Sequence, residues 1–126
     1  MPFILAVDFD GTLFDGNFPK SGEPNWVIIK QVKEFKKYGA EIVLWTCRDG
    51  EVLQEAIDKC KEVGLVFDAH NDNTASQKIY IEKQGDGKSF SKRKIFANFY
   101  LDDRAHNLDF FLTIDAKKTC EKFKNY

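Results

Sequence analysis

Short, nearly continuous apolar runs are the feature that most restricts how this chain can fold. Residues 3–9, 41–46 and 97–103 read FILAVDF, EIVLWT and ANFYLDD, with little alternation between apolar and polar positions. Such runs are typical of strands that are covered on both faces, as in a parallel sheet. A shorter run at 65–70 predicts another strand, and FFLTI at 110–114 predicts a fifth.

Amphipathic segments lie between these runs. Residues 26–38 and 51–63 carry apolar side chains at helical spacing, and Gly39 and Gly64 follow them as stop signals. A short helix is expected at about 115–124. Alternating strands and helices predict an α/β fold, which we expect to be a three-layer, Rossmann-like parallel sheet of about five strands. Residues 71–94 are polar and give no clear prediction of secondary structure.

Length and composition limit the protein classes to consider. The 126 residues fit one domain, 1–126, and 43% hydrophobic with 31% charged residues is ordinary for a globular protein. A net charge of -1 gives no overall attraction to nucleic acid or to a membrane. Three widely spaced cysteines predict reduced thiols in a cytoplasmic protein. No signal pattern and no membrane-spanning stretch is expected.

Polar side chains gather where the predicted strands end. In an open parallel sheet, ligands bind at the carboxyl ends of the strands. The residues found at those ends are Asp8 and Asp10, then Thr46 and Arg48, then Asp102, Asp103 and Arg104. This coincidence is stronger evidence for a site than any single motif.

Asp8 and Asp10 raise an electrostatic problem, since strand alternation puts both on one side of the chain. Asp102 and Asp103 arrive at the same edge if their strand lies beside the first. So many carboxylates repel one another unless a hard cation lies among them. Mg²⁺ fits, because it prefers oxygen ligands and keeps positions for water and a substrate phosphate.

Such a site can transfer phosphoryl groups. A carboxylate beside Mg²⁺ can attack phosphorus, and a second carboxylate can protonate the leaving group and then activate water. Thr46 can donate a hydrogen bond to a phosphoryl oxygen, and a lysine can neutralise charge. Gly11 lets the chain turn sharply after the acids.

Three segments are similar to motifs of the haloacid dehalogenase (HAD) superfamily. DFDGT followed by an apolar residue resembles the first motif, VLWTCR the second and FYLDDR the fourth. The third motif is an upstream lysine, for which Lys94 and Lys92 both qualify and Lys94 is preferred. The resemblance spans residue 3 to about 112 and is weak between 71 and 90.

The resemblance implies a magnesium-dependent phosphatase that forms an aspartyl-phosphate. In it Asp8 is the nucleophile and Asp10 the general acid/base, and Thr46 and Lys94 complete the catalytic set. The implied metal ligands are Asp8, the Asp10 carbonyl, Asp102 and, directly or indirectly, Asp103. The dehalogenase branch lacks an acid in the place of Asp10 and needs no metal, so the resemblance favours the phosphatases.

The two gaps where this family inserts cap domains, 12–26 and 71–90, are short here, so the resemblance is to small capless members. TCR and DDR are also similar to triplets in the phosphatase domain of phage polynucleotide kinase-phosphatase, where an arginine in the place of Arg48 contacts the substrate phosphate. The expected substrate-binding residues are Gly11, Cys47, Arg48 and Arg104. With Phe14 and Phe18 of the first loop and the basic run 92–94, the arginines would form an open rim.

The expected partner is a phosphorylated small molecule, a nucleotide or a nucleic-acid end. No interaction with a membrane is expected. The sequence does not determine the oligomeric state, and in an oligomer a neighbouring subunit could act as the cap. Two other readings of the acids remain. One is a receiver-type signalling module, which the order of the acids and Thr46 along the chain disfavours. The other is a catalytically idle protein that binds phosphorylated ligands.

Overall fold

The computed structural model describes residues 1–84 and 93–123 of the chain. In this part of the chain, four parallel strands form one sheet in the order β3-β2-β1-β4. The strands are β1 Ile4–Val7, β2 Glu41–Leu44, β3 Ala69–His70 and β4 Phe99–Leu101. The protein therefore has a mixed α/β fold that is compatible with a Rossmann-like arrangement.

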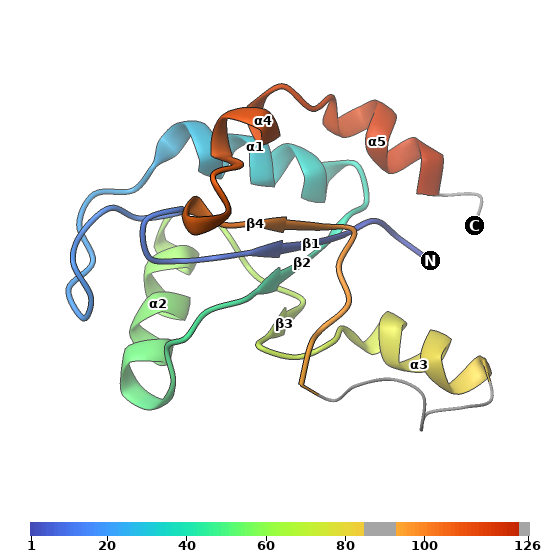
Figure 1. The fold of residues 1–126 in the computed structure, drawn as a ribbon, viewed down its shortest axis with the longest axis horizontal. Coiled ribbons are helices and arrows are strands. Elements are labelled where there is room, and N and C mark those ends of the chain that lie inside the picture. Colours follow the sequence, from blue (N-terminus) through green and yellow to red (C-terminus); the bar gives the residue numbers. More distant parts are fainter. Residues whose placement is uncertain (85–92, 124–126) are drawn as a thin grey trace.

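The helices of the described residues lie on both sides of this sheet. Figure 1 shows α1, α4 and α5 together on one side and α3 on the other. The α-helices are α1 Trp26–Lys37, α2 Gly50–Glu62, α3 Ala75–Lys83, α4 Leu108–Leu112 and α5 Ala116–Phe123, and Asp103–Ala105 form the short 3₁₀ helix η1. Across residues 1–84 and 93–123, no helix combines the length and the apolarity that crossing a membrane requires.

The position of β1 in the middle of the sheet explains its unbroken apolar sequence. Leu5 and Val7 belong to the larger of two buried apolar clusters, which also contains side chains of α1, α2, α4 and α5. Ile4 and Ala6 point to the opposite face and join the smaller cluster, with Val43, Ile95 and Ala97. Because both faces of β1 are covered, all four of its side chains are buried.

The prediction of a fifth strand at 110–114 is wrong. Helix α4 occupies Leu108–Leu112, and the sheet of the described residues has four strands. Phe111 is fully buried and stacks on Phe35 of α1 with ring centroids 5.1 Å apart, whereas Phe110 is 62% exposed. One buried face of this kind fits a short helix lying on α1, whereas a central strand would bury both of its faces.

The other elements are close to their predicted places, with two differences. The strand expected at 65–70 is reduced to its last two residues, Ala69–His70. The polar stretch after it contains α3, whose first turn is closed by a capping box. In it, Thr74 accepts a hydrogen bond from the Gln77 amide, and the Gln77 side chain accepts one from the Thr74 amide.

The segment between β1 and α1 doubles back on itself beside the carboxyl end of the sheet. The Asp15 amide donates to the Glu23 carbonyl at 2.9 Å, and the Gly22 amide donates to the Asp15 carbonyl. The Asn25 amide donates to the Leu13 carbonyl at 2.8 Å, which returns the chain to its starting point before α1. We call residues 15–24 the flap.

Candidate functional site

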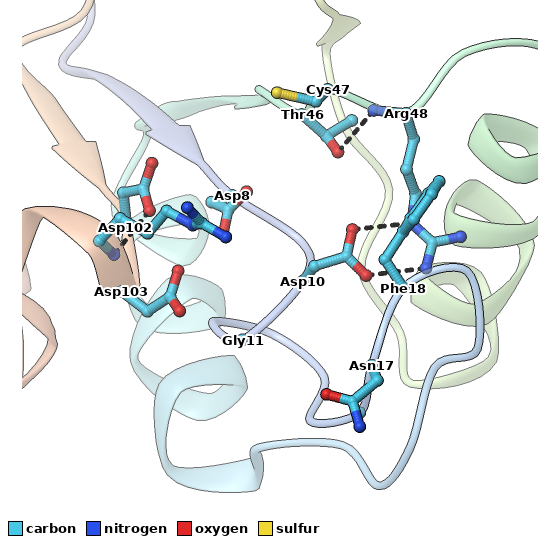
Figure 2. Close-up of a pocket in the computed structure, with 12 residues that line it drawn as sticks. Asp8, Asp10, Gly11, Asn17, Phe18, Thr46, Cys47, Arg48, Asp102 and Asp103 are labelled. Carbon is cyan, nitrogen blue, oxygen red and sulfur yellow. Dashed lines mark hydrogen bonds and ion pairs between the residues drawn. The ribbon is translucent and has the colours of Figure 1, made fainter.

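A pocket of about 740 Å³ lies at the carboxyl ends of β1, β2 and β4, next to the flap (Figure 2). This is the edge at which an open parallel sheet binds its ligands. Its lining includes all seven residues predicted from the strand ends. The lining residues are Asp8, Asp10, Gly11, Gly16, Asn17, Phe18, Thr46, Cys47, Arg48, Asp102, Asp103 and Arg104.

Three carboxylates meet in this pocket. Asp8, Asp102 and Asp103 each offer one oxygen atom, and these atoms all lie within 4.8 Å of one another. They come together because β1 pairs with β4, which brings Val7 opposite Leu101. The Oδ1 atom of Asp103 is buried without a hydrogen-bond partner in the described residues. A buried carboxylate oxygen without a donor fits a site that takes a cation.

The acid cluster perturbs the ionisation of Asp8. Burial, as the largest cause, and then the negative charge of Asp102 raise the pKa of the Asp8 carboxyl from 3.8 to about 7. The hydrogen bond from Thr12 acts in the opposite direction, and the charge of Asp103 adds to the rise. Without a cation, therefore, the cluster retains a proton at Asp8 at a pH where an exposed aspartate is ionised.

Thr12 joins the two halves of the cluster. Its hydroxyl group donates to Asp8 Oδ2 at 3.1 Å and accepts from the Asp103 amide at 3.0 Å. The Thr12 side chain is fully buried, so this bridge is shielded from water. The hydroxyl group thus fixes one Asp8 oxygen relative to the end of β4, which is distant in sequence.

Gly11 allows Asp103 to approach the loop after β1. Its φ of +82° is in the left-handed region, and a Cβ atom there would lie 2.3 Å from Asp103 Oδ2. Only glycine satisfies both the backbone conformation and the close approach. Gly11 therefore makes room for the Asp103 carboxylate.

Asp10 is turned toward Arg48 and away from the three acids (Figure 2). Arg48 Nε donates to Asp10 Oδ2 and Nη2 to Asp10 Oδ1, both at 2.8 Å, as a two-pronged ion pair. The hydrogen bonds with Asp10 raise the pKa of Arg48 above its usual value. Two further donations, to the carbonyls of Val52 and Pro19, link the guanidinium to α2 and to the flap.

The expectation that Arg48 lies on an exposed rim is wrong, because its side chain is 1% exposed. It lines the pocket and contacts the rings of Phe9 and Phe18. The carbonyl and carboxylate groups around Arg48 allow its side chain to be buried, since a buried guanidinium needs acceptors for its hydrogens. Arg48 therefore connects Asp10, α2 and the flap.

The end of β2 is held by a residue that sequence reasoning missed. Asn71, just after β3, accepts from the Thr46 amide at 2.8 Å through its side-chain oxygen. Its side-chain amide donates to the Arg48 carbonyl at 3.4 Å. The Thr46 hydroxyl group accepts from the Arg48 amide at 3.1 Å and lines the pocket together with the exposed Cys47. Asn71 could have been found by applying the strand-end rule to the third strand.

The predicted lysine is not among the residues that line the pocket. Lys94 lies over the ring of Tyr100, with its Nζ atom 5.4 Å from the ring centroid. Its alternative, Lys92, lies outside the described residues. The exposed cation that lines the pocket is Arg104, whose amide donates to Asp102 Oδ1 at 2.9 Å.

The aromatic residues around the flap divide into two groups. Phe14 is buried and stacks on Phe9, with centroids 5.0 Å apart, so it belongs to the core. Phe18 is 60% exposed and lines the pocket beside Asn17. The first loop therefore contributes one ring to the core and one to the mouth of the pocket.

Comparison with known proteins finds a solved structure that is similar in fold and in sequence. It is the structure of a conserved protein from Bacteroides thetaiotaomicron, with a TM-score of 0.67 and 30% sequence identity. The match covers 99% of this chain and 92% of that chain, and the description of that protein names no activity. No family model matches the chain, and no curated protein matches it.

Proposed function

Since this chain belongs to the same family as the conserved protein of Bacteroides thetaiotaomicron, whose description names no activity, we propose its function from the site itself. We propose that the protein is a Mg²⁺-dependent phosphomonoester hydrolase of the HAD type, without a cap domain. It acts through an aspartyl-phosphate on Asp8.

The observation that carries this proposal is the meeting of Asp8, Asp102 and Asp103 at one end of the sheet. The unpartnered, buried Oδ1 of Asp103 supports a cation there, and an all-oxygen donor set favours Mg²⁺. These three side chains would hold the metal. Bound Mg²⁺ supplies positive charge that keeps the carboxylates ionised and offsets the charge of a phosphate.

In the first step, a carboxylate oxygen of Asp8 attacks the phosphorus atom of the ester. A bond forms between that oxygen and phosphorus, and the bond from phosphorus to the alcohol oxygen breaks. Thr12 donates a hydrogen bond to Asp8 Oδ2, which restricts the rotation of the carboxylate. The Thr46 hydroxyl group and the Arg104 guanidinium, both lining the pocket, bind phosphoryl oxygens.

Asp10 moves the protons. It gives a proton to the departing alcohol oxygen and then takes one from the water that attacks phosphorus, which breaks the bond to Asp8 and releases phosphate. In the described conformation both Asp10 oxygens accept from Arg48. The catalytic cycle therefore requires that one of these two hydrogen bonds exchange when Asp10 carries the proton.

The test is hydrolysis of a generic aryl phosphate, with Mg²⁺ and with excess chelator. The wild-type protein should release phosphate only with Mg²⁺, and Asp8→Asn should lower turnover by at least about a thousandfold while the protein stays folded. Glu62→Gln, which removes an exposed charge on α2, is the matched control. Wild-type rates in the Asp8→Asn protein would exclude Asp8 as the nucleophile, and an inactive but Mg²⁺-binding wild-type protein would favour an idle phospho-ligand binder.

A further inference from the structure

The mouth of the pocket contains a layered stack that the phosphoryl chemistry does not require. Its innermost member is the buried ring of Phe9. The Arg48 guanidinium carbon lies 4.8 Å from the centroid of this ring and 5.1 Å from the centroid of the Phe18 ring. The stack thus runs from the core outward, and its last layer, Phe18, borders the pocket (Figure 2).

Phe18 is held in place although it is exposed. Arg48 contacts its ring, and the Arg48 Nη2 atom also donates to the carbonyl of the next residue, Pro19, at 3.1 Å. The ring is nevertheless 60% exposed, and leaving a large apolar surface in water is unfavourable. An aromatic ring that is fixed on a cation and open to a pocket is suited to take a further planar group.

Charge favours an aromatic partner over an aliphatic one. The faces of two aromatic systems are both electron-rich and repel each other when stacked directly. The positive guanidinium on the Phe18 ring draws electron density toward itself, which weakens that repulsion on the open side. Asn17, which also lines the pocket, offers one amide donor group and one acceptor to the edge of a planar heterocycle.

The volume of the pocket leaves room for more than a phosphoryl group. At about 740 Å³ it is within the range of pockets that enclose whole small molecules, about 300–1,000 Å³. The acid cluster and Phe18 line this same pocket. A phosphate at Asp8 and a planar group at Phe18 can therefore belong to one substrate.

We propose that the substrates are nucleoside monophosphates, with the base stacked on Phe18 and the phosphate at Asp8. This inference rests on the proposed function and names its substrate class. The same chemistry is present in a free mononucleotide and in the terminal nucleotide of a single-stranded oligonucleotide.

The experiment compares two substrates that differ only in the base, adenosine 5′-monophosphate and ribose 5-phosphate. Base stacking predicts a kcat/KM about 5- to 100-fold higher for the nucleotide. Phe18→Leu should remove most of this ratio through the KM for the nucleotide, whereas Phe18→Tyr should retain the ratio. Trp26→Leu is the matched control, because Trp26 is another exposed aromatic residue after the flap but does not line the pocket.

A 3′-phosphorylated oligonucleotide forms the third arm and distinguishes a strand end from a free nucleotide. Equal kcat/KM for the nucleotide and ribose 5-phosphate, or an equal loss for both in Phe18→Leu, would overturn the inference. Hydrolysis of the aryl phosphate in the same assay shows that the proposed function still holds in that case. If no substrate is hydrolysed, calorimetric binding of both ligands to the Asp8→Asn protein with Mg²⁺ decides, and equal affinities would overturn the inference.

Discussion

At the scale of single residues, the Thr12 hydroxyl group is the contact that fixes the geometry of the acid cluster. It has one partner on Asp8 and one on the backbone of Asp103, and water does not reach it. A misplaced nucleophile loses much of the advantage of orientation, since a displacement of about 1 Å can cost about a hundredfold in rate.

Thr12→Val keeps the shape of the side chain and removes both hydrogen bonds. We expect kcat for an aryl phosphate to fall about 10- to 100-fold with little change in KM, because orientation rather than binding is lost. Thr12→Ser keeps the hydroxyl group and should restore most of the rate. Steady-state kinetics of the three proteins checks this, and a Val variant within twofold of wild type would contradict the assigned role.

Arg48 is buried and pairs with Asp10, whose side chain is 29% exposed, so removing Arg48 leaves a partly buried carboxylate without its counter-charge. Arg48→Met should lower the free energy of unfolding by about 3–5 kcal/mol. Arg104→Met, at an exposed position, should change it by less than about 0.5 kcal/mol. Urea unfolding of both variants measures the difference. Equal, small effects would mean that the Arg48 contacts are not maintained in solution.

The sequence predicts which residues line the site better than it predicts how they interact. The strand-end rule finds Asp8, Thr46 and Asp102, because in a parallel sheet position along the strand determines which edge a residue reaches. It does not find that Arg48 is buried against Asp10, since this depends on how the flap folds over both. The capacity of Thr12 to bridge is also invisible until the pairing of β1 with β4 is known.

At the scale of elements, the turn after β1 determines whether Asp103 fits into the cluster. Gly11→Ala introduces a Cβ atom 2.3 Å from Asp103 Oδ2, in addition to an unfavourable backbone conformation. Gly39→Ala is a matched control, because Gly39 has a φ of +101° but nothing lies within 4 Å of its added Cβ. The two variants share the backbone cost and differ in the collision.

Both substitutions should therefore lower the free energy of unfolding by about 1–2 kcal/mol. Gly11→Ala should in addition weaken Mg²⁺ binding about tenfold or more, whereas Gly39→Ala should not. Isothermal titration with Mg²⁺ checks this. Equal Mg²⁺ affinities in the two variants would show that Asp103 does not need its present position.

Among the elements, clear helical periodicity predicted α1 and α2 within one or two residues, and the apolar runs predicted β1, β2 and β4 to within two residues at each end. The run at 110–114 was ambiguous, since five apolar residues suit a strand or a short buried helix equally. The stacking of Phe111 on Phe35 of α1 favours the helix over the strand. The capping box of Thr74 and Gln77 is a local sequence signal that indicates the start of α3.

At the scale of the whole molecule, the acid cluster makes stability depend on pH when no metal is bound. The pKa of Asp8 is about 7 in the folded protein against 3.8 ordinarily, so the folded state holds this proton more tightly. The resulting stabilisation is complete below pH 3.8 and is lost as the pH rises to about 7. Above that pH the ionised cluster destabilises the fold.

Thermal melting without metal should therefore show a difference between Asp8→Asn and wild type that grows from pH 5 to pH 8. Because Asp8 is partly exposed, solvent screening reduces the effect, and we expect the variant to melt about 3–6 °C higher at pH 8. Glu62→Gln should follow wild type at both pH values. Mg²⁺ should raise the wild-type Tm at pH 8 and not that of an Asp102→Ala, Asp103→Ala double variant. A difference independent of pH would contradict the origin assigned to it.

The strand order has a consequence for the chain while it is being synthesised. Strand β1 precedes the other three strands of this sheet in the chain but lies inside it, and its partner β4 is made about ninety residues later, with Leu5 opposite Phe99. A nascent chain that has not yet reached Asp102 can pair β1 with β2 but lacks two of the three clustered carboxylates. A chain that has not been synthesised past Asp103 is thus unable to assemble the acid cluster.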